Sequence, residues 1–199
     1  MNTMKEMVKK DSDLREEGLQ VEEIDEKNKS ELAALIKTIA VAFGVTLFLN
    51  SAVLVNAMVP SSSMEGTLYP GDRFFGNRLA YQNDGPERFD IIVFKYPDDE
   101  SLMYVKRVIG LPGERIEIID GKVYVDGNGE PLNDSFIKEP MIGSFGPYEV
   151  PEDSYFVLGD NRNNSNDSRR WKHTFVRRDQ ILGKGVVIYW PLKHMKLLD

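Results

Sequence analysis

An uncharged apolar stretch, long enough to cross a lipid bilayer, constrains this chain more than any other feature. It runs from Thr38 to Val59 (TIAVAFGVTLFLNSAVLVNAMV), 22 residues without Asp, Glu, Lys or Arg. As a helix rising about 1.5 Å per residue it would be about 33 Å long, and the hydrocarbon core of a bilayer is about 30 Å thick. The stretch therefore predicts one membrane-spanning helix.

A buried core helix and a cleaved secretory signal both fit this stretch less well. A core helix normally carries one polar face, and none is visible here. A secretory signal has a short basic leader and an apolar region of about 7 to 15 residues, whereas a long charged segment precedes this stretch. We therefore expect a retained anchor that binds the chain to a lipid bilayer.

The lysines near the stretch predict its orientation. Lys27, Lys29 and Lys37 lie on its amino side, and the first cation on the other side is Arg73. Because cations close to a span favour the cytosolic face, we expect a single-pass protein of the cell membrane with a cytosolic N-terminus and an extracellular remainder. The predicted parts are a charged tail at 1–31, a transmembrane anchor at 32–59 and an external β-rich domain at 60–199.

The residues after the anchor form short β-rich runs that are separated by turn residues. The clearest is Arg115 to Val125, two runs joined at Asp120-Gly121, a pair that favours a tight type I′ hairpin. The other runs are 90–95, 102–109, 155–158 and 185–190. The predicted fold class is mostly β, with a single N-terminal transmembrane helix followed by an antiparallel β domain.

Composition excludes several classes of function. The chain has no cysteine, so a thiol nucleophile, a cysteine-based zinc site and disulfides are ruled out. Its net charge of −7 argues against general nucleic-acid binding, which requires a basic face. We expect no metal, no cofactor and no nucleic-acid partner.

A serine cluster directly after the anchor is the first candidate for chemistry. Ser61 to Ser63 follow Pro60, a residue that cannot continue a helix. A serine nucleophile needs a base, but neither His173 nor His194 comes with a local catalytic signature. By themselves, however, serines after a proline commonly form only a loop or a cap.

Lys106 can supply the base if burial lowers the pKa of its amine. Strand alternation places Lys106 on one face with Leu102, Tyr104 and Val108, whereas Arg107 points to the other face. A strand lysine more commonly keeps its amine in water, so the position alone leaves both interpretations open.

A dense polar loop, Gly159 to Arg169, follows the apolar run 155–158. Loops on a rigid sheet are where functional sites tend to be built. A calcium loop is excluded, because Arg162, Ser165 and Trp171 occupy positions 3, 6 and 12 counted from Asp160. A network of turns capped by Asn and Asp is the other interpretation.

Together these segments resemble type I signal peptidases, the Ser/Lys endopeptidases that remove signal peptides from exported preproteins. Pro60 to Leu68 looks like the family's serine box, Tyr104 to Glu114 like its lysine box, and Gly159 to Arg169 like its G-D-N-R-x-x-S-x-D-S-R box. Weaker family patterns match at 88–94 and 183–191. The single anchor and compact external domain look like the short Gram-positive members.

The resemblance implies a role for each matching residue. Ser63 would be the nucleophile and Lys106 the general base, with the Ser63 N–H and the Ser61 hydroxyl as the oxyanion hole. Ser165 would orient the Lys106 amine. Four residues would support the dyad as pairs, namely Asp167 with Arg169 and Asp160 with Arg107. The residues that would shape small substrate pockets, suited to Ala-x-Ala sites, are Met64, Leu68, Tyr104 and Val105.

The sequence departs from the family pattern at Ser62, Gly66 and Phe89, where Gly, Pro and Gly are usual. Gly66 allows more backbone freedom than Pro beside Ser63. None of these departures removes a catalytic group. The family's eukaryotic branch, with His in place of the lysine, is disfavoured because Lys106 is present.

Two further functions fit parts of the pattern. One is a membrane-anchored binding module with the same fold; the intact Ser63, Lys106 and Ser165 argue against it. The second is a self-cleaving Ser/Lys protease, which would carry a DNA-binding domain that residues 1–30 cannot form. A separate S-x-x-K spacing, at 135–138, lacks the helix that penicillin-binding enzymes require.

Overall fold

The structure is a computed structural model that describes residues 28–198. Its N-terminal helix, Asn28–Val53, is the one helix in this part of the chain that is long and apolar enough to cross a membrane. The last turn, η1 (Leu49–Val53), is a π-helix. The expectation of one apolar helix of membrane-spanning length is confirmed. Most of the predicted charged tail lies outside the described residues, although Asn28 to Glu31 form the first turn of the helix.

The predicted C-terminal end of the helix, Val59, was wrong, because the helix ends at Val53. Residues Leu54–Met58 form strand β1, which pairs antiparallel with β2 (Arg73–Asn77). The side chain of Val55 enters the core while its neighbours Leu54 and Asn56 are more exposed. An apolar run of this kind fits a helix or a strand equally well from sequence, and a strand partner about 20 residues further on decides between them.

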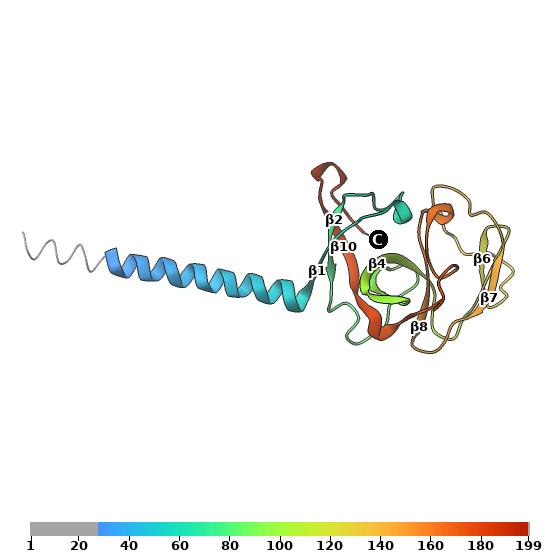
Figure 1. Ribbon diagram of the computed structural model, residues 1–199, viewed down its shortest axis with the longest axis horizontal. Coiled ribbons are helices and arrows are strands. Elements are labelled where there is room, and N and C mark those ends of the chain that lie inside the picture. Colours follow the sequence, from blue (N-terminus) through green and yellow to red (C-terminus); the bar gives the residue numbers. More distant parts are fainter. Residues whose placement is uncertain (1–27, 199) are drawn as a thin grey trace, which may run out of the picture. The chain divides into compact units, whose positions relative to one another are not determined.

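An antiparallel eight-stranded sheet forms most of the domain (Figure 1). The strands follow the order β1-β2-β10-β3-β4-β8-β9, with β11 paired to β10. The bounds of the strands not yet given are β3 Ile91–Tyr96, β4 Asp99–Gly110, β8 Ser154–Leu158, β9 Val176–Arg177, β10 Ile181–Trp190 and β11 Lys196–Leu197. The predicted runs at 90–95, 102–109, 155–158 and 185–190 all fall in this sheet, and the mostly β fold class is confirmed.

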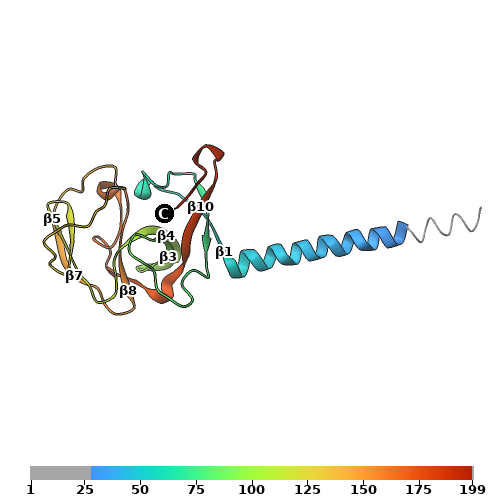
Figure 2. The same cartoon turned by 180° about the vertical axis from the view of Figure 1, so that it is seen from behind.

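A second antiparallel sheet contains β6 (Lys122–Val125), β5 (Arg115–Ile119) and β7 (Phe145–Glu149), in that order. It lies at the end of the domain away from β1 and β2, as both views show (Figures 1 and 2). The turn between β5 and β6 has positive φ at Asp120 (48°) and Gly121 (80°), as a type I′ turn requires. The predicted hairpin is confirmed.

The core divides into three apolar clusters on the two sheets. The first joins Val55 and Phe74 to Met64 and Leu68, so it lies directly under the serine segment. The second packs the small sheet against β4 and β8, and the third surrounds Trp171. Burying a side chain of this size contributes about 1.5 to 3 kcal/mol. The first cluster therefore fixes the backbone on which the serines lie.

Candidate active site

The serine segment follows β1 as a short 3-10 turn, η2 (Ser62–Met64). Met64 is fully buried in the first core cluster, and the amide N–H of Leu68 donates to its carbonyl at 2.8 Å. Ser63 is 8% exposed. The core therefore holds the backbone of this turn while the hydroxyl of Ser63 stays within reach of a substrate.

Lys106 lies on β4 and points at this serine. Its Nζ donates to Ser63 Oγ at 2.7 Å and to the Val105 carbonyl at 3.0 Å. Burial lowers the pKa of Lys106 to about 8, against the opposing charges of Asp167 and Asp160. An amine with such a pKa is uncharged in a useful fraction of molecules near neutral pH, and the uncharged form can accept a proton.

The polar loop, residues 159–169, lies against the serine turn and is called the site loop below. The amide N–H of Asn161 donates to the Ser63 carbonyl at 3.1 Å, and its Nδ2 donates to the Ser62 carbonyl at 3.1 Å. Asn164 Nδ2 donates to Ser62 Oγ at 2.9 Å. The sequence analysis did not single out these two asparagines; Asn161 is the N of the G-D-N-R box, whereas Asn164 falls at one of its unspecified positions and carried no signal.

Two buried ion pairs hold the site loop. Arg107 forms a bidentate pair with Asp160, at 2.9 and 2.8 Å, and Thr67 also donates to that carboxylate. Arg169 forms a bidentate pair with Asp167 at 2.8 Å. The two pairings that the sequence predicted are both present. Their four side chains are almost completely buried, so each charge depends on its partner.

The two remaining predicted serines, Ser61 and Ser165, differ in their contacts. Ser61 Oγ donates to Ser63 Oγ at 3.3 Å. Ser165 is buried next to Gly159, but its hydroxyl has no hydrogen-bond partner among residues 28–198 and does not bond to Lys106.

An open cleft of about 500 Å³ lies beside Ser63 and Lys106. Its walls are apolar at Ala57, Val93 and Val105. Its lining also includes Tyr104, whose ring centroid lies 5.3 Å from Lys106 Nζ.

Two of the four predicted pocket residues, Met64 and Leu68, do not line this cleft. Both are completely buried in the first core cluster. They are part of the floor that supports the serine turn. Tyr104 and Val105 do line the cleft.

The two histidines take no part in the site. His173 pairs with Asp98 at 2.8 Å and His194 pairs with Asp72 at 2.6 Å. Within residues 28–198, no cluster of three or more His, Asp or Glu side chains could hold a metal ion.

Comparison with known proteins shows the family of the chain. The family model described as "Signal peptidase, peptidase S26" matches residues 32–190. A protein named "Signal peptidase I" from Leptolyngbya laminosa is 40% identical over 176 residues, covering 85% of each chain. "Probable signal peptidase I-2" from Synechocystis is 39% identical over 82% of this chain and 74% of its own. "Signal peptidase I P" from Bacillus subtilis subsp. natto is 33% identical over 86% of this chain and 96% of its own.

A solved structure is also similar. It is the crystal structure of a signal peptidase I from Enterococcus faecalis V583, which is 36% identical and covers 50% of this chain and 95% of that chain, with a TM-score of 0.42. From the family model and the relatives, this chain belongs to the signal peptidase family, peptidase S26. It is a hydrolase, a serine endopeptidase.

Proposed function

We propose that this protein is a single-pass membrane enzyme that removes signal peptides from exported preproteins by means of a Ser63/Lys106 dyad. The observation that carries the proposal is the 2.7 Å hydrogen bond between the Ser63 hydroxyl and a buried amine with a lowered pKa. The apolar cleft beside this pair supports it as well, since a peptide has to lie there to be cut.

The proposed reaction begins when the uncharged Lys106 amine accepts the proton of the Ser63 hydroxyl. Ser63 Oγ then attacks the carbonyl carbon of the scissile peptide bond, and the resulting ammonium of Lys106 protonates the departing amine as the C–N bond breaks. The product that leaves is the mature protein, and the signal peptide stays bound to Ser63 as an ester. A water molecule, deprotonated by Lys106, hydrolyses this ester and restores Ser63.

The negative charge that develops on the carbonyl oxygen needs donors. The backbone N–H of Ser63 and the hydroxyl of Ser61 are our candidates. Ser61 Oγ is 3.3 Å from Ser63 Oγ, so its hydroxyl has to turn from Ser63 toward the substrate oxygen. One donor of this kind is typically worth about 2.7 to 4 kcal/mol.

Ser165 and the two ion pairs would support the dyad. A bond from Ser165 to the Lys106 amine would orient the amine toward Ser63, and the hydroxyl has no other partner in residues 28–198. The pairs Arg107–Asp160 and Asp167–Arg169 would hold the loop that carries Ser165. The carboxylates of Asp160 and Asp167 also limit how far the pKa of Lys106 falls.

The cleft favours small apolar substrate side chains. Its walls at Ala57, Val93 and Val105 offer no charge to a substrate side chain. We propose a preference for Ala at the first and third positions before the cut, an Ala-x-Ala site.

The N-terminal helix would anchor the enzyme in the membrane from which the preproteins emerge. The lysines at positions 27, 29 and 37 would keep the N-terminus cytosolic, so the β domain, which begins with β1 at Leu54, would lie on the outer face.

The substrate class is tested with a purified preprotein that has Ala-x-Ala before the expected cut, incubated with the detergent-solubilised full chain. We expect one cut directly after the second Ala, identified by mass spectrometry of the new N-terminus. The matched substrate has Phe in place of that Ala and should be cut at least about 100-fold more slowly, because the larger ring has to displace packed side chains. No cutting of either preprotein by folded protein in the presence of lipid would favour the anchored binding module.

A further inference from the structure

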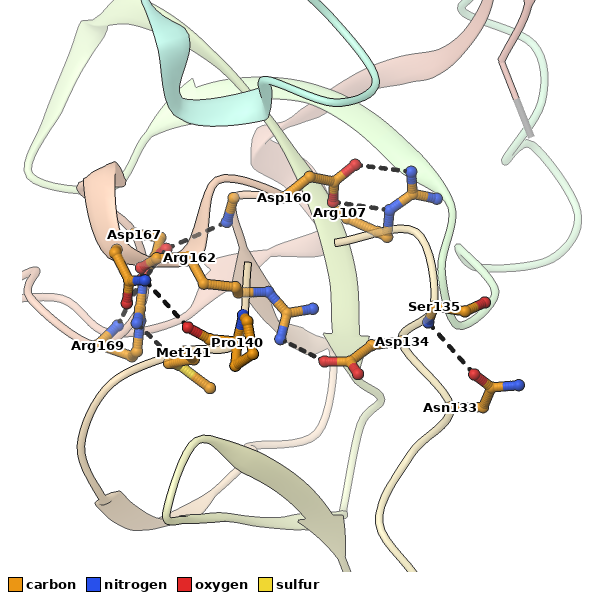
Figure 3. A network of polar contacts seen from close by, with 12 residues as sticks. Arg107, Asn133, Asp134, Ser135, Pro140, Met141, Asp160, Arg162, Asp167 and Arg169 are labelled. Carbon is orange, nitrogen blue, oxygen red and sulfur yellow. Dashed lines mark hydrogen bonds and ion pairs between the residues drawn. The ribbon is translucent and has the colours of Figure 1, made fainter. Parts of the chain in front are cut away.

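A segment outside the family's motifs packs on the back of the site loop. Residues 133–142, called the strap below, connect β6 to β7 and contain no helix or strand. The sequence drew attention to them only through the S-x-x-K spacing at 135–138. In Figure 3 the strap lies beside the site loop, with Asp134 directed at Arg162 and Met141 directed at Arg169.

The strongest contact is an ion pair between Asp134 and a fully buried arginine. Arg162 Nη1 donates to Asp134 Oδ2 at 2.8 Å, and the Arg162 side chain is 0% exposed. Within residues 28–198, Asp134 is the one carboxylate at ion-pair distance from Arg162, and two other guanidinium nitrogens, Nε and Nη2, have no hydrogen-bond partner. The buried charge of Arg162 therefore depends on the strap.

A second contact links the strap to Arg107 and Arg162. The ring centroid of Phe136 lies 4.2 Å from Cζ of Arg107 and 5.8 Å from Cζ of Arg162. Arg107 is the partner of Asp160 at the start of the site loop. A guanidinium over an aromatic face is favourable, and more so away from water. Phe136 thus couples the strap to the Arg107–Asp160 pair.

The far end of the strap is fixed to the same loop by hydrogen bonds. Asn163 accepts from the amide N–H of Ile142 at 2.9 Å and donates to the Pro140 carbonyl at 3.0 Å. Arg169 Nη1 donates to Met141 Sδ at 2.9 Å (Figure 3). Both ends of the strap, Asp134 and residues 140–142, are therefore bound to the site loop.

The opposite side of the site loop touches the serine turn. Asn161, next to Arg162, donates to the carbonyls of Ser62 and Ser63. A displacement of Arg162 would move this donor directly, whereas the apolar cleft walls at Val93 and Val105 belong to strands β3 and β4.

We infer that the strap positions the site loop for catalysis, with Asp134 as its principal positioning residue through Arg162. This inference rests on the proposed function, because it concerns how the Ser63/Lys106 pair is held. It assigns a role to a segment that forms no hydrogen bond with Ser63 or Lys106 within residues 28–198. Its signature is a fall in kcat that is larger than any change in KM, since the strap supports the reacting groups and not the apolar cleft walls on β3 and β4, although the site loop adds Asn164 and Asn166 to the lining.

The test compares full-length Asp134→Asn with wild type by kcat, KM and melting temperature on the Ala-x-Ala preprotein. Asp134→Asn keeps the shape of the side chain but removes the charge that Arg162 needs. We expect kcat to fall about 10-fold or more with KM within about twofold of wild type. Asp134→Glu keeps the charge and should recover most of kcat. The matched control is Glu139→Gln, which removes an exposed strap charge that forms no ion pair within residues 28–198 and should behave as wild type.

Phe136→Leu is the second variant, and it decides the question if Asp134→Asn does not fold. It should lower kcat in the same way. The inference is overturned if folded variants keep the wild-type kcat, if only KM rises, or if kcat falls only in proportion to the unfolded fraction. Wild-type protein that does not cut the preprotein would contradict the proposed function instead, so the two failures can be told apart.

Discussion

Lys106→Met is expected to abolish signal-peptide cleavage while the protein stays folded. Methionine keeps the unbranched shape in this buried site but has no amine to take the proton of Ser63. We expect kcat/KM to fall by about 10³-fold or more, in the upper part of the range for loss of a general base. The measurement is the initial rate of preprotein cleavage, with folding followed by circular dichroism.

The matched control and the double variant sharpen this prediction. Lys95→Met removes an exposed strand lysine of β3 and should leave the rate within about twofold of wild type, as for most surface substitutions. Ser63→Ala alone, Lys106→Met alone and both together should be equally inactive, because residues that act as a unit give non-additive losses. If the rate loss of the double variant equals the product of the two single losses, the two side chains act independently.

Gly159→Ala is expected to be nearly as damaging, although glycine takes no part in the chemistry. A Cβ at this position would collide with the Ser63 carbonyl oxygen and with Ser165 Oγ. Either the serine turn or the site loop then has to move. Because a misplacement of about 1 Å can cost about 100-fold in rate, we expect a loss of that size or larger.

The rate and the melting temperature of Gly159→Ala should be measured beside those of Gly129→Ala. Gly129 has nothing within 4 Å of its built Cβ and does not have a positive φ, so its substitution should change neither quantity appreciably. Wild-type activity in Gly159→Ala would show that the site tolerates separation of the loop from Ser63, against the packing described above.

The resemblance of three short motifs to a known family predicted which of the site residues lie close together, whereas each motif by itself left other interpretations open. Ser63, Lys106 and the pairs Arg107–Asp160 and Asp167–Arg169 are all brought together as expected. The apolar anchor and the hairpin at Asp120 were predictable without the resemblance, since each depends on local pattern alone.

Features that depend on contacts far apart in the sequence were harder to predict. Strand β1 resembles the end of the apolar helix until its pairing with β2 is known. Met64 and Leu68 were placed in the substrate pockets, but which side chains of the segment after β1 enter the core is decided by the sheet against which the segment packs. Asp134 lies in none of the motifs that the sequence analysis recognised. Its proposed role depends on its ion pair with the buried Arg162, which is 28 positions away.

The most direct test of the Ser63/Lys106 mechanism is the pH dependence of kcat/KM for a peptide substrate that does not itself titrate between about pH 5 and pH 10. Only the uncharged Lys106 amine can accept a proton, so the rate should rise with pH and level off above the lowered pKa of about 8. Below that value the rate should fall about 10-fold per pH unit, to about 1% of the plateau near pH 6. A rate that stays constant from about pH 6 to pH 9, with chemistry as the slow step, would contradict Lys106 as the base.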